Sequence, residues 1–191
     1  MLIDRIIGVF TFRKEVYAEV EQDTTFTNTA WLLVAIVAFL NQLGTRPFKS
    51  IGNSILGSMV GTLVILVGFA IGVWLISWIG RSLFNADVTF NELVRTLGLA
   101  YVWNIIGLIG ILTSFSAALS CALAPVQIAG ALLSLIAWLL AAKEALDLDW
   151  GQTILTVIVG WVVMFFVGVF VGGAILGALG LGAAITRGLF S

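Results

Sequence analysis

The chain has 191 residues, 61% of them hydrophobic and 10% charged, with nine basic and ten acidic side chains and a mean hydropathy of +1.15. Soluble domains average about 25% charged residues, so the charges here are too few to coat a water-exposed surface. The formal net charge of −1 also excludes the basic stripe that nucleic-acid binding calls for.

The composition offers few side chains that could bind a metal or a haem. The sequence has one cysteine, Cys121, and no histidine. An intrachain disulfide is therefore impossible, and the usual ligand sets for haem and zinc are missing. We expect no metal and no cofactor, and we interpret Cys121 as a small apolar residue in a helix or turn.

Residues 1–23 alternate apolar and charged side chains with helical periodicity, which Phe12 interrupts. One stripe holds Ile3, Ile6, Ile7, Phe10, Tyr17 and Val20. The pattern predicts an N-terminal amphipathic helix. Two placements stay open, because both bury the same face: the helix lies in the membrane interface, or it packs beneath the spanning helices.

Four stretches without a charged residue follow, at 24–45, 50–80, 96–142 and 150–186. A membrane-spanning helix needs about 20 mostly apolar residues. The third stretch is too long for one helix, so it must contain a hairpin. The sequence predicts an all-α polytopic membrane protein, in which residues 24–191 form a five-helix transmembrane domain. The expected spans are about 26–43, 53–80, 90–113, 123–143 and 152–176, followed by a Gly-rich tail.

Local signals place the ends of several spans. Thr89-Phe-Asn-Glu92 is a capping box at the start of the third span, and Asp149-Trp-Gly-Gln152 repeats its logic before the fifth. Pro125 is expected in the first turn of the fourth span, where its missing N–H costs nothing. For the last stretch, two short helices broken at Gly172-Gly173 are the alternative to one long helix.

The distribution of charge predicts an orientation. Basic residues favour the cytoplasmic side of a span, and six of the nine fall on the side of the N-terminus: Arg5, Arg13, Lys14, Arg81, Arg95 and Lys143. All ten carboxylates fall on that side too. We expect a cytoplasmic N-terminus and, with five spans, a C-terminus outside.

Glycines spaced four residues apart mark close helix packing in membranes. The candidate packing positions are Gly57, Gly61, Gly68 and Gly72 on the second span, and Gly168 and Gly172 on the fifth. They suit packing inside one bundle or, alternatively, the interface of a homo-oligomer.

A few polar residues are candidates for function. Asn104, with Tyr101 one turn before it, is expected to be buried on the third span, while Asn41, Gln42 and Gln127 lie near helix ends. Arg95 is expected to pair with Glu92 or Asp87, or to extend toward the cytoplasmic surface. The acidic cytoplasmic layer either binds a cation or basic partner or is simply solvated.

Enzyme signatures are missing from the sequence. It contains no G-x-S-x-G, HExxH, phosphate-loop or dinucleotide pattern. The span hydroxyls Ser54, Ser58 and Ser77 have no intramembrane histidine, lysine or carboxylate to activate them. We therefore expect a protein that is not an enzyme.

Three segments carry a family resemblance. MLIDRIIGVFTFRKEVYAEVEQD resembles the opening of prokaryotic Yip1-domain membrane proteins. NADVTFNELVRTLGLAYVWNII resembles the entry to their third span, and LLSLIAWLLAAKEALDLDWGQTILTVIVGWVV their fourth and fifth spans. The resemblance implies a five-span bundle with a cytoplasmic N-terminus in a prokaryotic cell membrane.

The resemblance does not extend to every family motif. The Asp-Leu-Tyr-Gly-Pro signature of eukaryotic members, which bind Rab-type GTPases, is absent, and Val102 rather than proline follows Ala100-Tyr101. Rab binding is therefore not carried over. We expect a non-enzymatic scaffold that contacts lipid and organises a membrane-protein partner or its own copies. The alternatives are a channel or transporter for a neutral or lipidic solute and an accessory subunit of a larger membrane complex.

Overall fold

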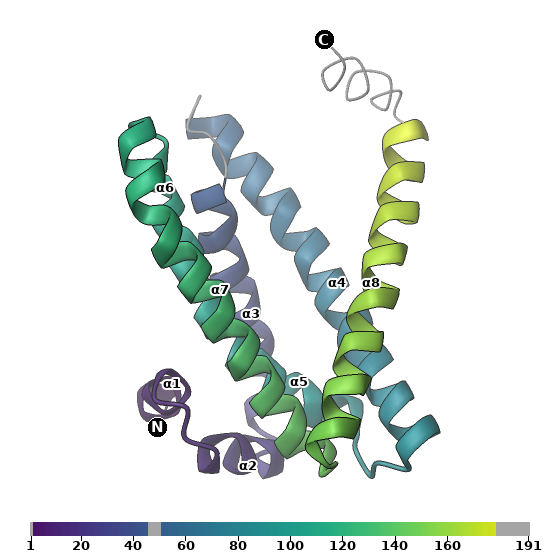
Figure 1. Cartoon of the computed structure of the whole chain (residues 1–191). Helices are drawn as coiled ribbons and strands as arrows, with labels where there is room; N and C mark the ends of the chain where they lie inside the picture. The colour runs from purple at the N-terminus through teal and green to yellow at the C-terminus, as the bar shows by residue number, and fades with distance from the viewer. Residues whose placement is uncertain (1, 46–50, 179–191) are drawn as a thin grey trace.

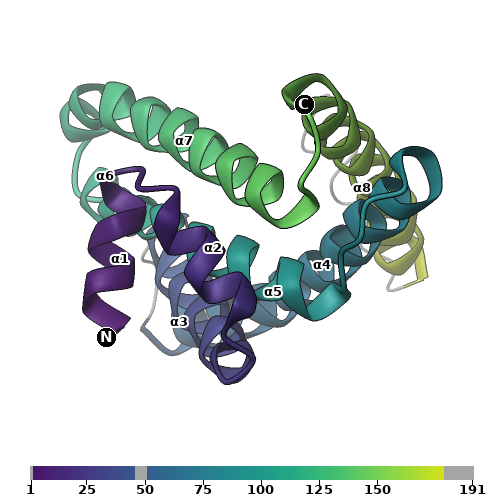
Figure 2. The ribbon, with the colours of Figure 1, turned by 90° about the horizontal axis from the view of Figure 1, so that it is seen from below.

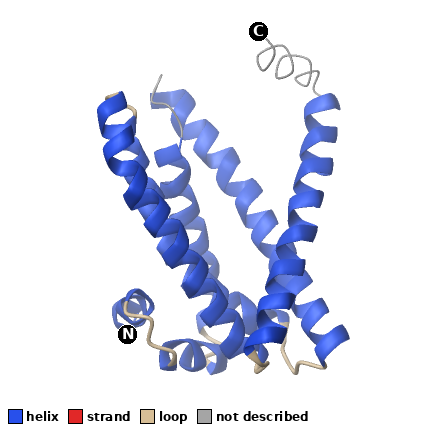
Figure 3. Cartoon of the chain, in the orientation of Figure 1, coloured by secondary structure: helices blue, strands red, loops and turns tan. Residues whose placement is uncertain are grey.

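The computed structural model describes residues 2–45 and 51–178, which form helices and no strand (Figures 1 and 3). In chain order the elements are α1 (Leu2–Phe10), α2 (Glu15–Gln22), α3 (Phe26–Thr45), α4 (Ile51–Phe84), α5 (Phe90–Ala100), the 3₁₀-helix η1 (Tyr101–Ile109), α6 (Gly110–Thr113), α7 (Ala117–Leu146) and α8 (Trp150–Ala178). The elements α5, η1 and α6 follow one another without a break and form one span.

The all-α polytopic membrane fold is confirmed. Within the described ranges, four helical segments are long and apolar enough to cross a membrane: Phe26–Thr45, Ser54–Phe84, Phe90–Thr113 and Ala117–Leu146. The stretch Trp150–Val163 of α8 is a shorter apolar helix. The helix α8 itself continues through Gly172-Gly173 to Ala178.

The N-terminal segment forms two helices where the sequence pattern suggested one. Phe12 has a φ of 54°, in the left-handed region that interrupts a right-handed helix, and this residue is the one that broke the apolar stripe. Its ring stacks on that of Trp103, with centroids 5.3 Å apart. We call α1 and α2 together the platform, because they lie across one end of the bundle (Figure 2).

The spans pack around the segment formed by α5, η1 and α6. Against it lie α3 on one side and α7 on another, while α8 packs mainly on α4. The helices α7 and α8 meet at the platform end and diverge toward the opposite, far end (Figure 1). The connections at 85–89 and 147–149 both lie at the platform end, so the acidic segments share one side of the bundle as the charge pattern indicated.

The fourth span begins earlier than the sequence suggested. Ser116 has extended backbone, and its hydroxyl accepts a hydrogen bond from the Leu119 N–H at 3.1 Å, so it caps a helix that starts at Ala117. Pro125 therefore lies inside α7 and not in its first turn, which corrects the prediction. The side-chain cap at Ser116 lets the helix begin at Ala117, well before Pro125, the residue that the prediction placed in its first turn.

The core lies toward the platform end. Its largest fully buried side chains come from α2, α4, α5 and α7: Tyr17, Ile76, Leu93, Leu97, Leu99 and Leu146. Other apolar side chains face outward along α4 and α7: Leu56, Val60, Leu63, Val64, Ile128 and Leu132. An exterior of this kind is solvated by hydrocarbon.

Candidate functional site

The 3₁₀ segment η1 organises the candidate site. In a 3₁₀-helix residues three apart lie on the same face, because each turn takes three residues. Residues at that spacing, from η1 into α6, are Tyr101, Asn104, Gly107, Gly110 and Thr113. An α-helix would rotate these positions away from one another, whereas here they form one stripe of small and polar residues.

This stripe lets η1 and α6 approach α3 at backbone distance. A Cβ added to Gly44 would lie 1.9 Å from the carbonyl oxygen of Gly107, and one added to Gly110 would lie 2.3 Å from that of Gly44. Asn41 donates from Nδ2 to the carbonyl oxygen of Asn104 at 2.7 Å. A side chain that occupies a helix carbonyl disturbs the i→i−4 ladder, which fits the 3₁₀ geometry at this point.

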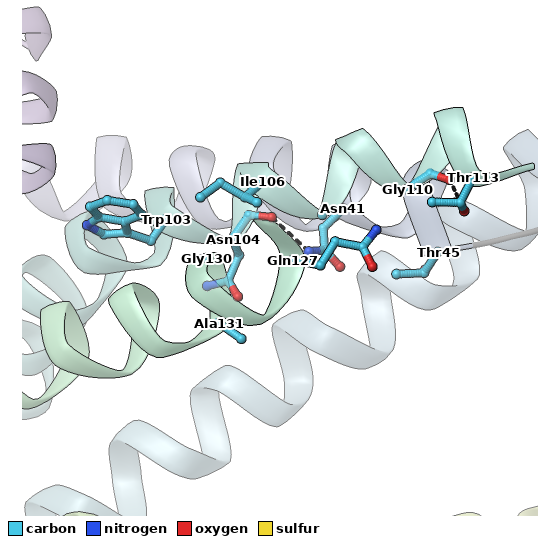
Figure 4. Close-up of a pocket in the computed structure, with 12 residues that line it drawn as sticks. Asn41, Thr45, Trp103, Asn104, Ile106, Gly110, Thr113, Gln127, Gly130 and Ala131 are labelled. Carbon is cyan, nitrogen blue, oxygen red and sulfur yellow. Dashed lines mark hydrogen bonds between the residues drawn. The ribbon is translucent and has the colours of Figure 1, made fainter. Parts of the chain in front are cut away.

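A cavity of about 420 Å³ opens beside the stripe (Figure 4). Its walls come from the end of α3, from η1 and α6, and from α7, and they include Asn41, Thr45, Trp103, Asn104, Thr113 and Gln127. Figure 4 shows the amides of Asn41, Asn104 and Gln127 gathered in its middle. The volume lies in the range of small-molecule sites.

A second cavity of about 280 Å³ adjoins the first and shares Asn104 and Ala131 with it. Its other walls are Tyr101, Ser134, Leu135, Trp138 and Trp161, from η1, α7 and α8. The rings of Trp138 and Trp161 lie 6.0 Å apart. We call the two cavities together the groove; one part is rich in amides and hydroxyls and the other in aromatic rings.

Several polar groups of the groove already have partners. Asn104 donates from Nδ2 to the Tyr101 carbonyl at 3.1 Å, and the Thr113 hydroxyl donates to the Gly110 carbonyl at 2.6 Å. The side-chain amide of Gln127, by contrast, makes no hydrogen bond to any described residue. None of the lining residues that the structure describes carries a formal charge at neutral pH, and this part of the lining suits an uncharged ligand that forms hydrogen bonds.

Trp103 connects the groove to the platform. Its indole lines the first cavity, and its Nε1 donates to the carbonyl oxygen of Val9 in α1 at 3.3 Å. The ring of Phe10 meets it edge-on with centroids 4.8 Å apart. The platform and one wall of the groove therefore share a side chain.

Arg95 holds the platform from the other side. It is only 5% exposed. Its Nε donates to the Val20 carbonyl at 3.0 Å, its Nη2 donates to the Glu21 carbonyl, and its Nη1 lies 3.3 Å from the Thr27 hydroxyl. Val20 and Glu21 are in the last turn of α2, where unpaired carbonyls and the helix dipole favour a cation.

This position of Arg95 corrects the pairing suggested from the sequence. The Glu92 carboxylate accepts instead from the Thr89 N–H at 2.7 Å, and the Thr89 hydroxyl accepts from the Glu92 N–H at 3.3 Å, which completes the expected capping box. Asp87 is exposed in the connection before α5. Neither carboxylate is the partner that the buried guanidinium uses.

Carboxylates gather around the end of α2. Partial burial raises the pKa of Glu21 to about 7, and the nearby charges of Asp147, Glu92 and Glu144 add to the rise, while Arg95 opposes it. At the outer edge of the platform, Arg5 forms ion pairs with Glu19 and Asp23 at 2.7 and 2.8 Å, which tie α1 to the end of α2.

The candidate packing glycines differ in their surroundings. A Cβ on Gly61 would lie 2.4 Å from Oε1 of Gln42, so this glycine faces α3. Gly72 is buried, and Gly57 and Gly68 are partly buried. The surroundings of Gly168 and Gly172, in α8, lie outside what the structure describes.

Asn104 and Tyr101, two of the residues singled out from the sequence, do lie together on the groove. Sequence reasoning missed Gly44, Gly107 and Gly110, because it searched for glycines four apart. The informative signal was the run of small and polar residues spaced three apart from Tyr101 to Thr113, whose first part the 3₁₀ turns of η1 place on one face.

Helices of this length and apolarity, with the charged residues collected near one end, define an integral multi-pass membrane protein. Within that class the chain belongs to the Yip1 family: the Yip1 domain profile matches residues 7–186, nearly the whole sequence. No curated protein sequence and no solved structure matches it.

Proposed function

We propose that this Yip1-family protein is a non-enzymatic organiser of its membrane surroundings, which holds partners through the platform. The observation that carries the proposal is the attachment of α1 and α2 to one end of the bundle through specific hydrogen bonds. Arg95 joins α2 to α5 and Trp103 joins α1 to η1, while the Arg5 ion pairs hold the two platform helices together. Both helices are much shorter than the spans.

The platform also presents an apolar edge. Ile3 is 70% exposed and Ile7 52%, whereas Val9 of the same helix is fully buried. The two exposed residues lie one turn apart and so share a face of α1. In the interface such a face contacts acyl chains or the helix of a partner. The buried Val16, Tyr17 and Val20 of α2 support the other placement, beneath the spans, for that helix.

Site-specific crosslinking tests this proposal. A photoreactive amino acid is placed at Ile3, at Ile7 or, as a control, at the buried Val9 position, and adducts are identified in cells. We expect one and the same protein partner from Ile3 and Ile7, none from Val9, and loss of the adduct in the Trp103→Leu variant, which detaches α1. Lipid adducts alone at both exposed positions would refute the scaffold proposal.

Orientation is part of the same proposal. We infer that the platform end faces the cytoplasm, because six of the nine basic residues belong to that side of the bundle. Single cysteines at Asn85 and at Ser116, in a Cys121→Ser background, place the two ends by membrane-impermeant thiol labelling. Labelling of Asn85→Cys from outside intact cells would reverse the topology.

Exposed apolar residues along α4 provide a candidate face for self-association, with Leu63 and Val64 at its middle. Gly61 is turned toward Gln42 inside the bundle, so a homo-oligomer would use these larger residues rather than the glycine. Disulfide trapping between Leu63→Cys copies is the direct check, and a strictly monomeric product would remove this contact from the proposal.

The groove supports a second candidate, a channel or transporter for a neutral or lipidic solute. Its volume, the absence of charge among its described lining residues and the amides around Asn104 are the features that favour it. Flux of neutral solutes or lipid into protein-containing liposomes decides it: equal rates with and without protein would exclude transport. An accessory role in a larger complex would appear as co-migration on native gels.

A further inference from the structure

The two parts of the groove lie at different depths along the helices. Thr45 ends α3 and Thr113 ends α6, so the amide-rich part reaches the far end of the bundle. Trp138 and Trp161 lie well inside α7 and α8 and line the aromatic part. The groove is thus polar toward one membrane surface and apolar toward the bilayer interior.

That order of polarity matches a lipid in one leaflet. A lipid of the leaflet opposite the platform has its headgroup near the far end and its chains near the middle of the bilayer. The amide-rich part offers the amide of Gln127, which has no hydrogen-bond partner among the described residues, as both donor and acceptor. The aromatic part offers Tyr101, Leu135 and the two tryptophans to a hydrocarbon chain.

The lining also limits which headgroups fit. Among the described residues that line the two cavities there is no lysine, arginine, aspartate or glutamate. A phosphate or ammonium group would lose its hydration without gaining an opposite charge, which is costly in a low-dielectric site. Hydroxyl or amide groups would instead exchange water for hydrogen bonds with Gln127 and its neighbours.

We propose that the groove binds a lipid with an uncharged, hydroxyl- or amide-bearing headgroup, taken from the leaflet opposite the platform. The head lies between Asn104, Thr113 and Gln127, and a chain lies along Trp138 and Trp161. The inference goes beyond the scaffold function and does not depend on it, because a partner could bind the platform with or without a lipid in the groove.

A photoreactive lipid tests the site in nanodiscs. The probe is a diacylglycerol with a diazirine in one chain, and a phosphatidylglycerol with the same chain is the charged comparison. We expect adducts of the neutral probe on the peptides that contain Leu135, Trp138 and Trp161, at least about fivefold above the charged probe, and competed by unlabelled diacylglycerol. Equal labelling by both probes, or adducts spread along the exposed face of α4, would overturn the proposal.

Two variants locate the head and the chain. Gln127→Leu removes one hydrogen-bonding group and is expected to weaken retention of the neutral lipid by about three- to tenfold, the equivalent of one hydrogen bond. Ala131→Phe fills the point where the two cavities meet and is expected to abolish specific labelling. Ile128→Phe adds a similar ring on the outer face of α7, where Ile128 is 62% exposed, and serves as the matched control.

The remaining results are also decisive. Unchanged labelling in both Gln127→Leu and Ala131→Phe would overturn the proposal even if the wild-type pattern were as expected. Crosslinks between two copies through Trp161 would assign the groove to an oligomer contact instead. Competition by unlabelled lipid is measured on the wild type, so a folding defect cannot account for its outcome. A failure of the platform crosslinking experiment would refute the scaffold proposal and would leave the lipid proposal standing.

Discussion

The guanidinium of Arg95 donates through Nε to the carbonyl oxygen of Val20, 3.0 Å away, and so joins the third membrane span to the last turn of α2. An arginine within an apolar span is costly unless its donors are satisfied. Here they are satisfied by groups that are themselves short of partners, the carbonyls at a helix C-terminus. These hydrogen bonds therefore satisfy both the buried guanidinium of Arg95 and the free carbonyl groups at the end of α2.

Arg95→Met should release α2 from the bundle while leaving the spans in place. Hydrogen bonds to a charged group contribute about 1.5–3 kcal/mol each, and water can replace part of the loss at the carbonyls, so we expect docking of α2 to weaken by about 2–4 kcal/mol. Hydrogen exchange across Glu15–Gln22 is the measurement. Arg95→Lys should give nearly the same result, since one ammonium cannot match the planar fork of arginine.

Arg81→Met is the control for this experiment. Arg81 is exposed at the platform end and donates from Nε to the Ser77 carbonyl of its own helix at 3.3 Å. Its loss should leave exchange in α2 unchanged. Equal protection of α2 in the wild type and in Arg95→Met would show that apolar packing of Val16 and Tyr17 holds the helix alone.

Docking of α2 should weaken as pH rises. Burial and the neighbouring Asp147, Glu92 and Glu144 raise the pKa of Glu21 from 4.5 to about 7, so the docked state keeps a proton that the undocked state has released. The docked state is therefore favoured most below pH 4.5, loses this advantage between 4.5 and 7, and keeps none of it above. Hydrogen exchange of α2, corrected for intrinsic rates, should increase over that interval.

Glu21→Gln should remove the pH dependence, because a neutral amide mimics the protonated carboxyl at every pH. The comparison variant is Glu15→Gln, which changes an exposed carboxylate in the first turn of the same helix. If Glu21→Gln still loosened with rising pH as the wild type does, another group would have to carry the effect.

The spans follow directly from the sequence because hydrocarbon imposes length and apolarity on every membrane helix. The Thr89–Glu92 capping box was predictable for a similar reason: it depends on four consecutive residues and on no tertiary contact. Signals of this kind are local, and the bilayer makes them stronger.

The site depends instead on contacts between distant residues. Arg95 meets carbonyls of residues 20 and 21, and a backbone carbonyl leaves no trace in a side-chain pattern. Likewise, Asn41 binds the main chain of Asn104 rather than its side chain. Sequence reasoning identified Arg95 and Asn104 as unusual, but it looked for charged or polar side chains as their partners.

Close contact between α3 and η1 should make Gly44 intolerant of any side chain. The Cβ of Gly44→Ala would lie 1.9 Å from the Gly107 carbonyl oxygen, and both helices would have to move apart. Overpacking of this kind costs about 1–3 kcal/mol or more, so we expect a clear loss of thermal stability in detergent. Gly151→Ala, where an added Cβ meets nothing within 4 Å, should be neutral or slightly stabilising.

The groove should respond to the Gly44→Ala change as well. Separation of α3 from η1 would pull Asn41 away from the Asn104 carbonyl, which is now 2.7 Å distant. The amide stretch of that carbonyl, followed by isotope-edited infrared spectroscopy, should shift to higher frequency as it loses this bond. An unshifted band in a destabilised variant would mean that the helices adjust elsewhere.

Trp103→Leu should detach α1 while retaining most of the apolar packing in η1. The change removes the hydrogen bond from Nε1 to the Val9 carbonyl and the ring contacts with Phe10 and Phe12. A hydrogen bond contributes about 0.5–1.5 kcal/mol, and each aromatic pair contributes about the same. Because every 1.4 kcal/mol corresponds to about a tenfold change in an equilibrium constant, the rate of hydrogen exchange in Leu2–Phe10 should rise by about one to three orders of magnitude. Trp78→Leu is the matched control, because Trp78 is 54% exposed on α4.

Trp103 also lines the groove, so Trp103→Leu should change lipid labelling there as well. If the platform loosened and lipid labelling in the groove stayed the same, the two sites would be independent.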